Sequence, residues 1–201
     1  ATRSYGARID FAASAAEAFA EVAELEREGW SFIHPFDDPA IMAGQGTMGL
    51  EILEDAPQMT DIVLAIGGGG MLTGVATAIK TLKPSVHIWG VETEGADCMA
   101  RSIEAGKIVT LEAITSKARS LGAAAPSERT FAAAKKLLES VTVVTDTDAS
   151  EAMQFLMERL KVVAEPAAAA TLAGADVLSS KFTGDRHVVL LLAGGNVSLK
   201  S

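Results

Sequence analysis

The chain has 201 residues, 49% of them hydrophobic, and a formal net charge of −9. Because no apolar run reaches the roughly 18 residues that a membrane-spanning helix needs, we expect a soluble protein with no membrane partner. The acidic balance and the lack of clustered lysine and arginine argue against binding to nucleic acid, whose phosphates require such clusters.

Short apolar runs rich in β-branched residues alternate along the chain with longer amphipathic runs. In chain order they predict a helix over 14–28, a strand-like stretch over 30–36, a helix over 39–55, a strand over 62–66, a helix over 72–80, a strand over 86–91, a helix over 98–105, a strand over 141–146, helices over 148–160 and 165–180, and a buried strand within 187–196 that runs into a glycine turn. This order is typical of an α/β protein, a three-layer parallel sheet with helices on both faces.

Several of these helices carry end signals. Ser14 and Glu17 form a capping box, and Gly29 is expected to end the first helix. Asp148 with Glu151 is expected to cap the helix that runs to about residue 160. The periodicity breaks only over 111–129 and 183–186, which we interpret as loops.

Four consecutive glycines, Gly67 to Gly70, separate the strand over 62–66 from the next helix. A helix that begins beside a glycine turn offers unpaired N–H groups and the positive end of its dipole, so it can bind an anion without a cationic side chain. A tight turn without a ligand is the alternative. The spacing fits neither the dinucleotide fingerprint, which fails at Thr73, nor the P-loop, which requires lysine where Val75 stands.

The segment "AIGGGGMLTG" resembles the phosphate-binding loop of pyridoxal-phosphate enzymes of the tryptophan-synthase β type, fold type II, in the branch of serine and threonine dehydratases and serine racemase. Further segments resemble the same branch in the same order: "HPFDDPAIMAGQGTMGLEIL", "GVETEGADCM", "ITSKARSLGA", "AEPAAAATLAG" and "LLLAGGNVSL". The resemblance implies that residues 1–38 form the end of a small domain and the crossover, and that 39–201 form the large domain. It also implies that about the first third of the usual chain lies upstream of Ala1.

The resemblance assigns residues to pyridoxal 5'-phosphate. Those implied to bind this cofactor are Gly67, Gly68, Gly69, Gly70, Met71, Glu165 and Ala193. The glycines and the backbone of Met71 would cradle the phosphate, and Glu165 would lie near the cofactor ring. The alternative for Glu165 is a first-turn carboxylate that stabilises the helix dipole.

The resemblance also implies a cation site, for a divalent or monovalent ion. Glu92 and the carbonyl of Ala96 match ligands of that site, and the third ligand falls on Cys98. A thiol is a poor ligand for a hard cation such as Mg²⁺ or Ca²⁺. The alternative for Glu92 is a carboxylate at a helix start.

Ala193 departs from the family, which usually has serine or cysteine there to hydrogen-bond the pyridine nitrogen. A weak partner at that nitrogen is tolerable for β-elimination, which needs less electron withdrawal by the ring than racemisation does. The substitution therefore favours a dehydratase over a racemase.

The family's chemistry also needs a lysine that holds the cofactor as a Schiff base and removes the substrate's α-proton. The family places it in a Ser-x-Lys-x-Arg-Gly segment before the glycine loop, where this chain has none. "TSKARS" imitates that segment but follows the loop, so we expect Lys117 to be a surface lysine. The Schiff-base lysine is expected upstream of Ala1, and no catalytic residue is assigned within the chain.

The implied activity is that of an ammonia-lyase that converts L-threonine or L-serine to a 2-oxo acid and ammonia. Two alternatives remain open: an amino-acid racemase or a dehydratase of another hydroxy amino acid, and a non-catalytic phosphate-binding fragment. The single cysteine, Cys98, suits a reducing cytoplasm. The family resemblance further implies a homo-oligomer, a dimer.

Overall fold

The computed structural model describes residues 2–13 and 15–198 of the chain. The chain divides into two compact units, Ala1–His34 and Pro35–Ser201. The predicted assignment of 1–38 and 39–201 to a small and a large domain remains a prediction. None of the helices within the described ranges combines the length and apolarity that crossing a bilayer requires.

The first unit contains η1 (Thr2–Tyr5) and α1 (Ala15–Arg27). Gly29, with φ of 98°, follows the end of α1 as predicted, whereas the predicted cap at Ser14 lies outside the described residues. The strand predicted over 30–36 is wrong. A strand is held by hydrogen bonds to a neighbour, and no described strand pairs with this stretch; instead the rings of Phe32 and His34 pack on each other, with centroids 5.4 Å apart.

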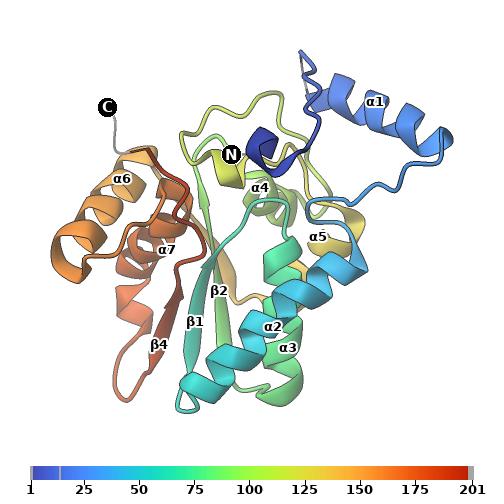
Figure 1. Ribbon diagram of the computed structural model, residues 1–201. Coiled ribbons are helices and arrows are strands. Elements are labelled where there is room, and N and C mark those ends of the chain that lie inside the picture. Colours follow the sequence, from blue (N-terminus) through green and yellow to red (C-terminus); the bar gives the residue numbers. More distant parts are fainter. Residues whose placement is uncertain (1, 14, 199–201) are drawn as a thin grey trace. The chain divides into compact units, whose positions relative to one another are not determined.

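The second unit is built on a parallel sheet, as expected. Its strands are β1 (Asp61–Ala65), β2 (His87–Thr93), β3 (Ser140–Val144) and β4 (Val188–Leu191), in the order β3-β2-β1-β4 (Figure 1). Every neighbouring pair is parallel, so all four carboxyl ends lie at one edge of the sheet. β1 is buried along its whole length, whereas β4 is an edge strand and only half-buried, not fully buried as predicted.

The helices of this unit are α2 (Pro39–Asp55), α3 (Gly70–Leu82), α4 (Cys98–Ala105), α5 (Glu128–Leu137), α6 (Asp146–Phe155) and α7 (Pro166–Val177), with short helical turns η2 (Arg119–Leu121), η3 (Leu156–Leu160) and η4 (Ser179–Lys181). The bounds of α2 and α4 are those predicted. α3 begins two residues earlier than predicted, inside the glycine run. α5 was not predicted, and its first two residues lie inside the segment 111–129 that we interpreted as a loop.

The predicted cap of α6 is also wrong, by three residues. Thr145, not Asp148, is the N-cap residue, and its hydroxyl accepts a hydrogen bond from the Asp148 N–H at 3.1 Å. Asp148 returns the contact by accepting from the Thr145 N–H at 2.9 Å. The reciprocal pair forms because it satisfies two backbone donors at once.

Alternation along β1 divides the core between the two faces of the sheet. Ile62 and Leu64 pack with residues of α3, α4 and α5, and Val63 packs with buried alanines of α6 and α7. Figure 1 shows α2 and α3 on one side of the sheet and α6 and α7 on the other. The predicted three-layer arrangement is confirmed.

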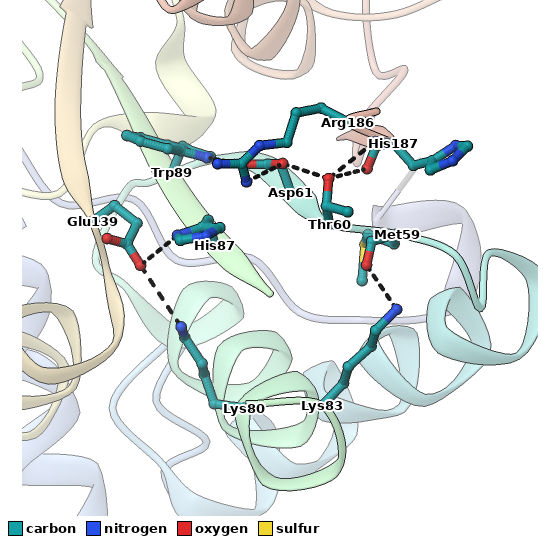
Figure 2. Close-up of polar contacts among 10 residues, drawn as sticks. All are labelled: Met59, Thr60, Asp61, Lys80, Lys83, His87, Trp89, Glu139, Arg186 and His187. Atoms are coloured by element: carbon teal, nitrogen blue, oxygen red, sulfur yellow. Dashed lines mark hydrogen bonds and ion pairs between the residues drawn. The ribbon is translucent and has the colours of Figure 1, made fainter. Parts of the chain in front are cut away.

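A buried charge joins three strands at the amino ends of the sheet (Figure 2). Asp61 is fully buried and accepts hydrogen bonds from Trp89 Nε1 at 3.0 Å, from Thr60 Oγ1 at 2.6 Å and from the Arg186 guanidinium at 3.0 and 3.3 Å. Arg186 precedes β4 and Trp89 lies in β2, so this contact fixes β4 and β2 against β1. We call it the Asp61 clamp.

Replacing Arg186 by methionine should destabilise this unit, because Asp61 would stay buried without its counter-charge. We expect the free energy of unfolding to fall by about 1.5–3 kcal/mol, the range for hydrogen bonds to charged groups. Urea unfolding measures the change. Arg159→Met is the matched control, since Arg159 is exposed and its loss should cost no more than about 0.5 kcal/mol. Equal losses in the two variants would contradict the clamp.

Candidate cofactor site

A cavity of about 340 Å³ opens at the carboxyl ends of β1 and β4. Ligands of parallel α/β sheets bind at this edge. The predicted cofactor-binding residues, which come from three separate stretches of the sequence, all line it: Gly67, Gly68, Gly69, Gly70, Met71, Glu165 and Ala193. Their proximity agrees with the predicted assignment, whereas the role of each residue remains a prediction.

The glycine loop is packed against protein on the side where β-carbons would stand. Gly69 is the N-cap residue of α3 and has φ of 91°, a left-handed conformation that favours glycine. A β-carbon there would lie 2.8 Å from Cβ of Thr130, and one on Gly70 would lie 2.7 Å from the carbonyl oxygen of Phe36. Neither position has space for a side chain.

The same loop leaves backbone donors for a ligand. The first hydrogen bond that closes α3 runs from the Thr73 N–H to the Gly69 carbonyl at 2.9 Å, and the first N–H groups of a helix have no partner within it. Gly70, Met71 and Leu72, which begin α3, line the cavity. A phosphate fits here, because these donors and the helix dipole favour an anion.

Glu165 lies in the cavity wall and is only 8% exposed. It is the N-cap residue of α7, but its side chain makes no bond to that helix. One oxygen accepts a hydrogen bond from the Ser120 hydroxyl, and the other accepts from the Asn196 N–H at 3.1 Å. The carboxylate therefore joins α7 to two other segments of the wall.

No lysine lines the cavity, as far as residues 2–13 and 15–198 are concerned. Lys117 is exposed, as predicted, and its backbone N–H donates to Oδ2 of Asp146 at 2.8 Å. Its side chain is not one of the groups that surround the cavity.

The predicted cation ligands lie elsewhere and do not fit a hard divalent ion. Glu92 is fully buried, and its two oxygens accept from the N–H groups of Met99 at 2.9 Å and Ala100 at 2.7 Å, so it binds the start of α4. Burial raises the pKa of Glu92 to about 8 despite these two bonds, which lower it. Burial, with the charge of Glu92 next, raises the pKa of Cys98 to about 12, so the thiol stays protonated.

Ala96 and Cys98 are both fully buried, and Cys98 Sγ lies 4.0 Å from Glu92 Oε1. In the part of the chain that the structure describes, no three residues of the types His, Cys, Asp and Glu are grouped so that they could hold a metal ion. The cation assignment of Glu92, Ala96 and Cys98 thus gains no support from the donor set.

Sequence reasoning missed several residues of the cavity wall: Phe36, Gln45, Arg119, Ser120, Leu121, Gly122 and Ala123. Most belong to the "ITSKARSLG" segment, whose resemblance to the family we noted without assigning any of its residues to the cofactor. Its resemblance to the family was the signal that could have placed it at the cofactor.

Comparison with known proteins agrees with this geometry. The pattern of the family described as pyridoxal-phosphate dependent enzyme matches residues 1–194. L-threonine ammonia-lyase of Geobacter sulfurreducens is 38% identical over 100% of this chain and 50% of its own length. The crystal structure of the T.th. threonine deaminase is 39% identical over 90% of this chain and 67% of its own, with a TM-score of 0.81. Maize serine racemase is 35% identical over 98% and 63%, with a TM-score of 0.91.

These matches define a class, the pyridoxal-phosphate enzymes of fold type II. The chain belongs to the pyridoxal-phosphate-dependent enzyme family. It spans about half the length of the first curated relatives that it matches.

Replacing Gly69 by alanine in the intact protein should impair cofactor retention. The added β-carbon would occupy a left-handed conformation and press on Thr130, which displaces the backbone donors at the start of α3. We expect the dissociation constant for pyridoxal 5'-phosphate to rise by about tenfold or more, equivalent to about 1.4 kcal/mol. Equilibrium dialysis measures it.

Gly184→Ala is the matched control. Gly184 has a similar φ of 73°, but nothing lies within 4 Å of its added β-carbon. It should lower stability by about 1–2 kcal/mol through backbone strain alone and leave cofactor affinity unchanged. A Gly69→Ala protein that binds cofactor normally would refute the cradle.

Replacing Cys98 by aspartate should make the thermal stability of the protein depend on a cation, because a carboxylate binds a hard cation and a thiol does not. The preceding residue, Asp97, has a buried Oδ1 with no hydrogen-bond partner among the described residues, so an oxygen without a partner stands next in sequence to the new carboxylate. We expect millimolar Ca²⁺ to raise the melting temperature of this variant and to leave that of the wild-type protein unchanged. Cys98→Asn has the same shape as the aspartate variant without its charge, so Ca²⁺ should change its melting temperature little or not at all. If Ca²⁺ raised the melting temperature of the wild-type protein as much as that of Cys98→Asp, the conclusion that the wild-type residues fit a hard cation poorly would be wrong.

Proposed function

We propose that the intact protein is a pyridoxal-phosphate-dependent ammonia-lyase that converts L-threonine or L-serine to a 2-oxo acid and ammonia. The observation that carries the proposal is the single cavity lined by the glycine loop, Glu165 and Ala193. The names of the threonine ammonia-lyases to which the chain is similar support the choice of substrate.

The chain's own part in this activity is to bind and orient the cofactor. When bound, pyridoxal phosphate supplies the electron sink that stabilises negative charge at the substrate's α-carbon. The N-terminus of α3 holds the phosphate with backbone donors, which fixes one end of the cofactor. Phe36 and Leu121 line the cavity beside the glycine loop and shield it from water on those sides.

Ala193 supports elimination over racemisation. It lines the cavity, and its side chain is a methyl group, which neither donates nor accepts a hydrogen bond. With no hydrogen-bonding side chain at this position to pair with the pyridine nitrogen, the cofactor ring withdraws electrons from the substrate less strongly. Loss of a β-hydroxyl tolerates this, because the departing group carries charge away.

An amino-acid racemase is the second candidate, favoured by the similarity to a serine racemase structure. Both activities would use the same cofactor and the same cavity. Cytoplasmic location, which rests on the single cysteine, and dimerisation, which rests on family resemblance, are part of the proposal.

Turnover by the purified intact protein tests the proposal. We expect L-threonine to yield 2-oxobutanoate and ammonia in equal amounts, measured by hydrazone formation and by an ammonia electrode. D-serine formed from L-serine without ammonia would favour the racemase. Cofactor binding with no turnover of either amino acid would favour a non-catalytic protein.

The 201-residue chain by itself should release no ammonia, because no lysine lines the cavity in the described part of the chain. Ammonia release that survives Lys117→Ala would contradict this.

A further inference from the structure

The segment Ser116–Leu121 crosses the carboxyl ends of the strands, and we call it the strap. Its first residue is held by the ends of β2 and β3. The Ser116 hydroxyl donates to Oδ1 of Asp146 at 2.7 Å and lies 2.8 Å from Oγ1 of Thr93, the last residue of β2. Because its one proton goes to Asp146, Ser116 accepts from Thr93, and it also accepts from the Ala118 N–H at 3.0 Å.

The other end of the strap reaches the glycine loop after β1 and, through Glu165, the turn after β4. A β-carbon on Gly67 would lie 3.2 Å from Cα of Leu121 and 3.2 Å from the carbonyl oxygen of Ser120, so the strap packs directly on the glycine loop. The Ser120 hydroxyl donates to Glu165, and Glu165 holds the turn after β4 through the Asn196 N–H. The strap is therefore tied to the carboxyl end of every strand of the sheet.

Apolar contacts fix the underside of the strap. Ala118 and Leu121 are buried at 1% and 6% exposure. They form a cluster with Ala65 at the end of β1, Ala96, and Ala167 in α7. Buried contacts and hydrogen bonds hold the strap against the sheet, whereas the exposed Ser120 is held by the hydrogen bond from its hydroxyl to Glu165.

We infer that the strap is a positioning element of the cofactor cavity, and that Ser120 is the residue that orients Glu165. This inference rests on the proposed cofactor function of the same cavity. The backbone N–H of Glu165 donates to the Gly194 carbonyl at 3.1 Å, so its main chain and its side chain both bind the turn after Ala193. The Ser120 hydroxyl is thus the link between that turn and the glycine loop.

Losing the Ser120 hydroxyl should loosen one wall of the cavity while leaving the fold intact. Oε1 of Glu165 would lose its donor, and the carboxylate could rotate away from the Asn196 N–H. The turn that carries Ala193 would then have fewer contacts with the glycine loop. The affinity for a ligand that touches both the glycine loop and the turn that carries Ala193 should therefore fall.

Binding of pyridoxine 5'-phosphate to the intact protein tests the inference, because this cofactor analogue lacks the aldehyde and needs no lysine. We expect Ser120→Ala to raise its dissociation constant by roughly threefold to tenfold, the loss of about one hydrogen bond. Hydrogen exchange of the Asn196 amide should speed up in the same variant. Ser120→Thr, which keeps the hydroxyl, should restore both values.

Ser180→Ala is the matched control, because Ser180 is an exposed serine of the same unit outside the strap; it should change neither measurement. If Ser120→Ala lowers the melting temperature but folded protein binds the analogue as the wild type does, the hydroxyl is only structural and the inference is wrong. Unchanged exchange at Asn196 would also overturn it. Failure of the wild-type protein to bind either the analogue or the cofactor would instead reject the proposed function.

Discussion

The burial of β1 on both faces is the constraint on which the rest of the second unit depends. A strand with apolar side chains on both sides must lie inside a parallel sheet, between neighbours and under helices on each face. Its two ends then differ in what they can do. Asp61 closes the amino end with a buried charge, and the glycines after Ala65 leave the carboxyl end open to a ligand. The glycine loop therefore lies at the end of β1 that the cavity reaches.

The protein has a formal net charge of −9, so a local field that attracts an anion to the glycine loop has to oppose the overall charge. The start of α3 supplies it, because backbone N–H groups and a helix dipole act over a few ångströms, whereas the exposed carboxylates are screened by salt. Arg119 adds a cation to the cavity wall. Glu165 lies in the same wall, where each of its oxygens accepts a hydrogen bond from the protein.

The sequence predicted elements whose signals are local and missed contacts that depend on distant residues. Gly106, with φ of 69°, ends α4 where the pattern placed it, because a left-handed glycine decides a helix end by itself. The strand expected over 30–36 failed because a strand needs a neighbour, which no local pattern reports. The contact between Ser120 and Glu165 spans 45 residues and depends on how α7 packs on the sheet, so neither residue's sequence surroundings could have indicated it.

The end of β2 shows how the glycine loop is supported from two sides. Glu92 and Thr93 are adjacent in a strand and so point to opposite faces. Glu92 binds the start of α4, and Cε of Met99 in that helix lies 3.1 Å from where a β-carbon on Gly69 would stand. Thr93 is joined to the strap through Ser116. Leu121, at the end of the strap, lies against Gly67. Two neighbouring residues of one strand thus support the glycine loop, one near Gly69 and the other near Gly67. The first of these contacts is made through the Glu92 carboxyl group, which accepts from the N–H groups of Met99 and Ala100, so side chains of the fold itself hold both neighbours of the glycine loop.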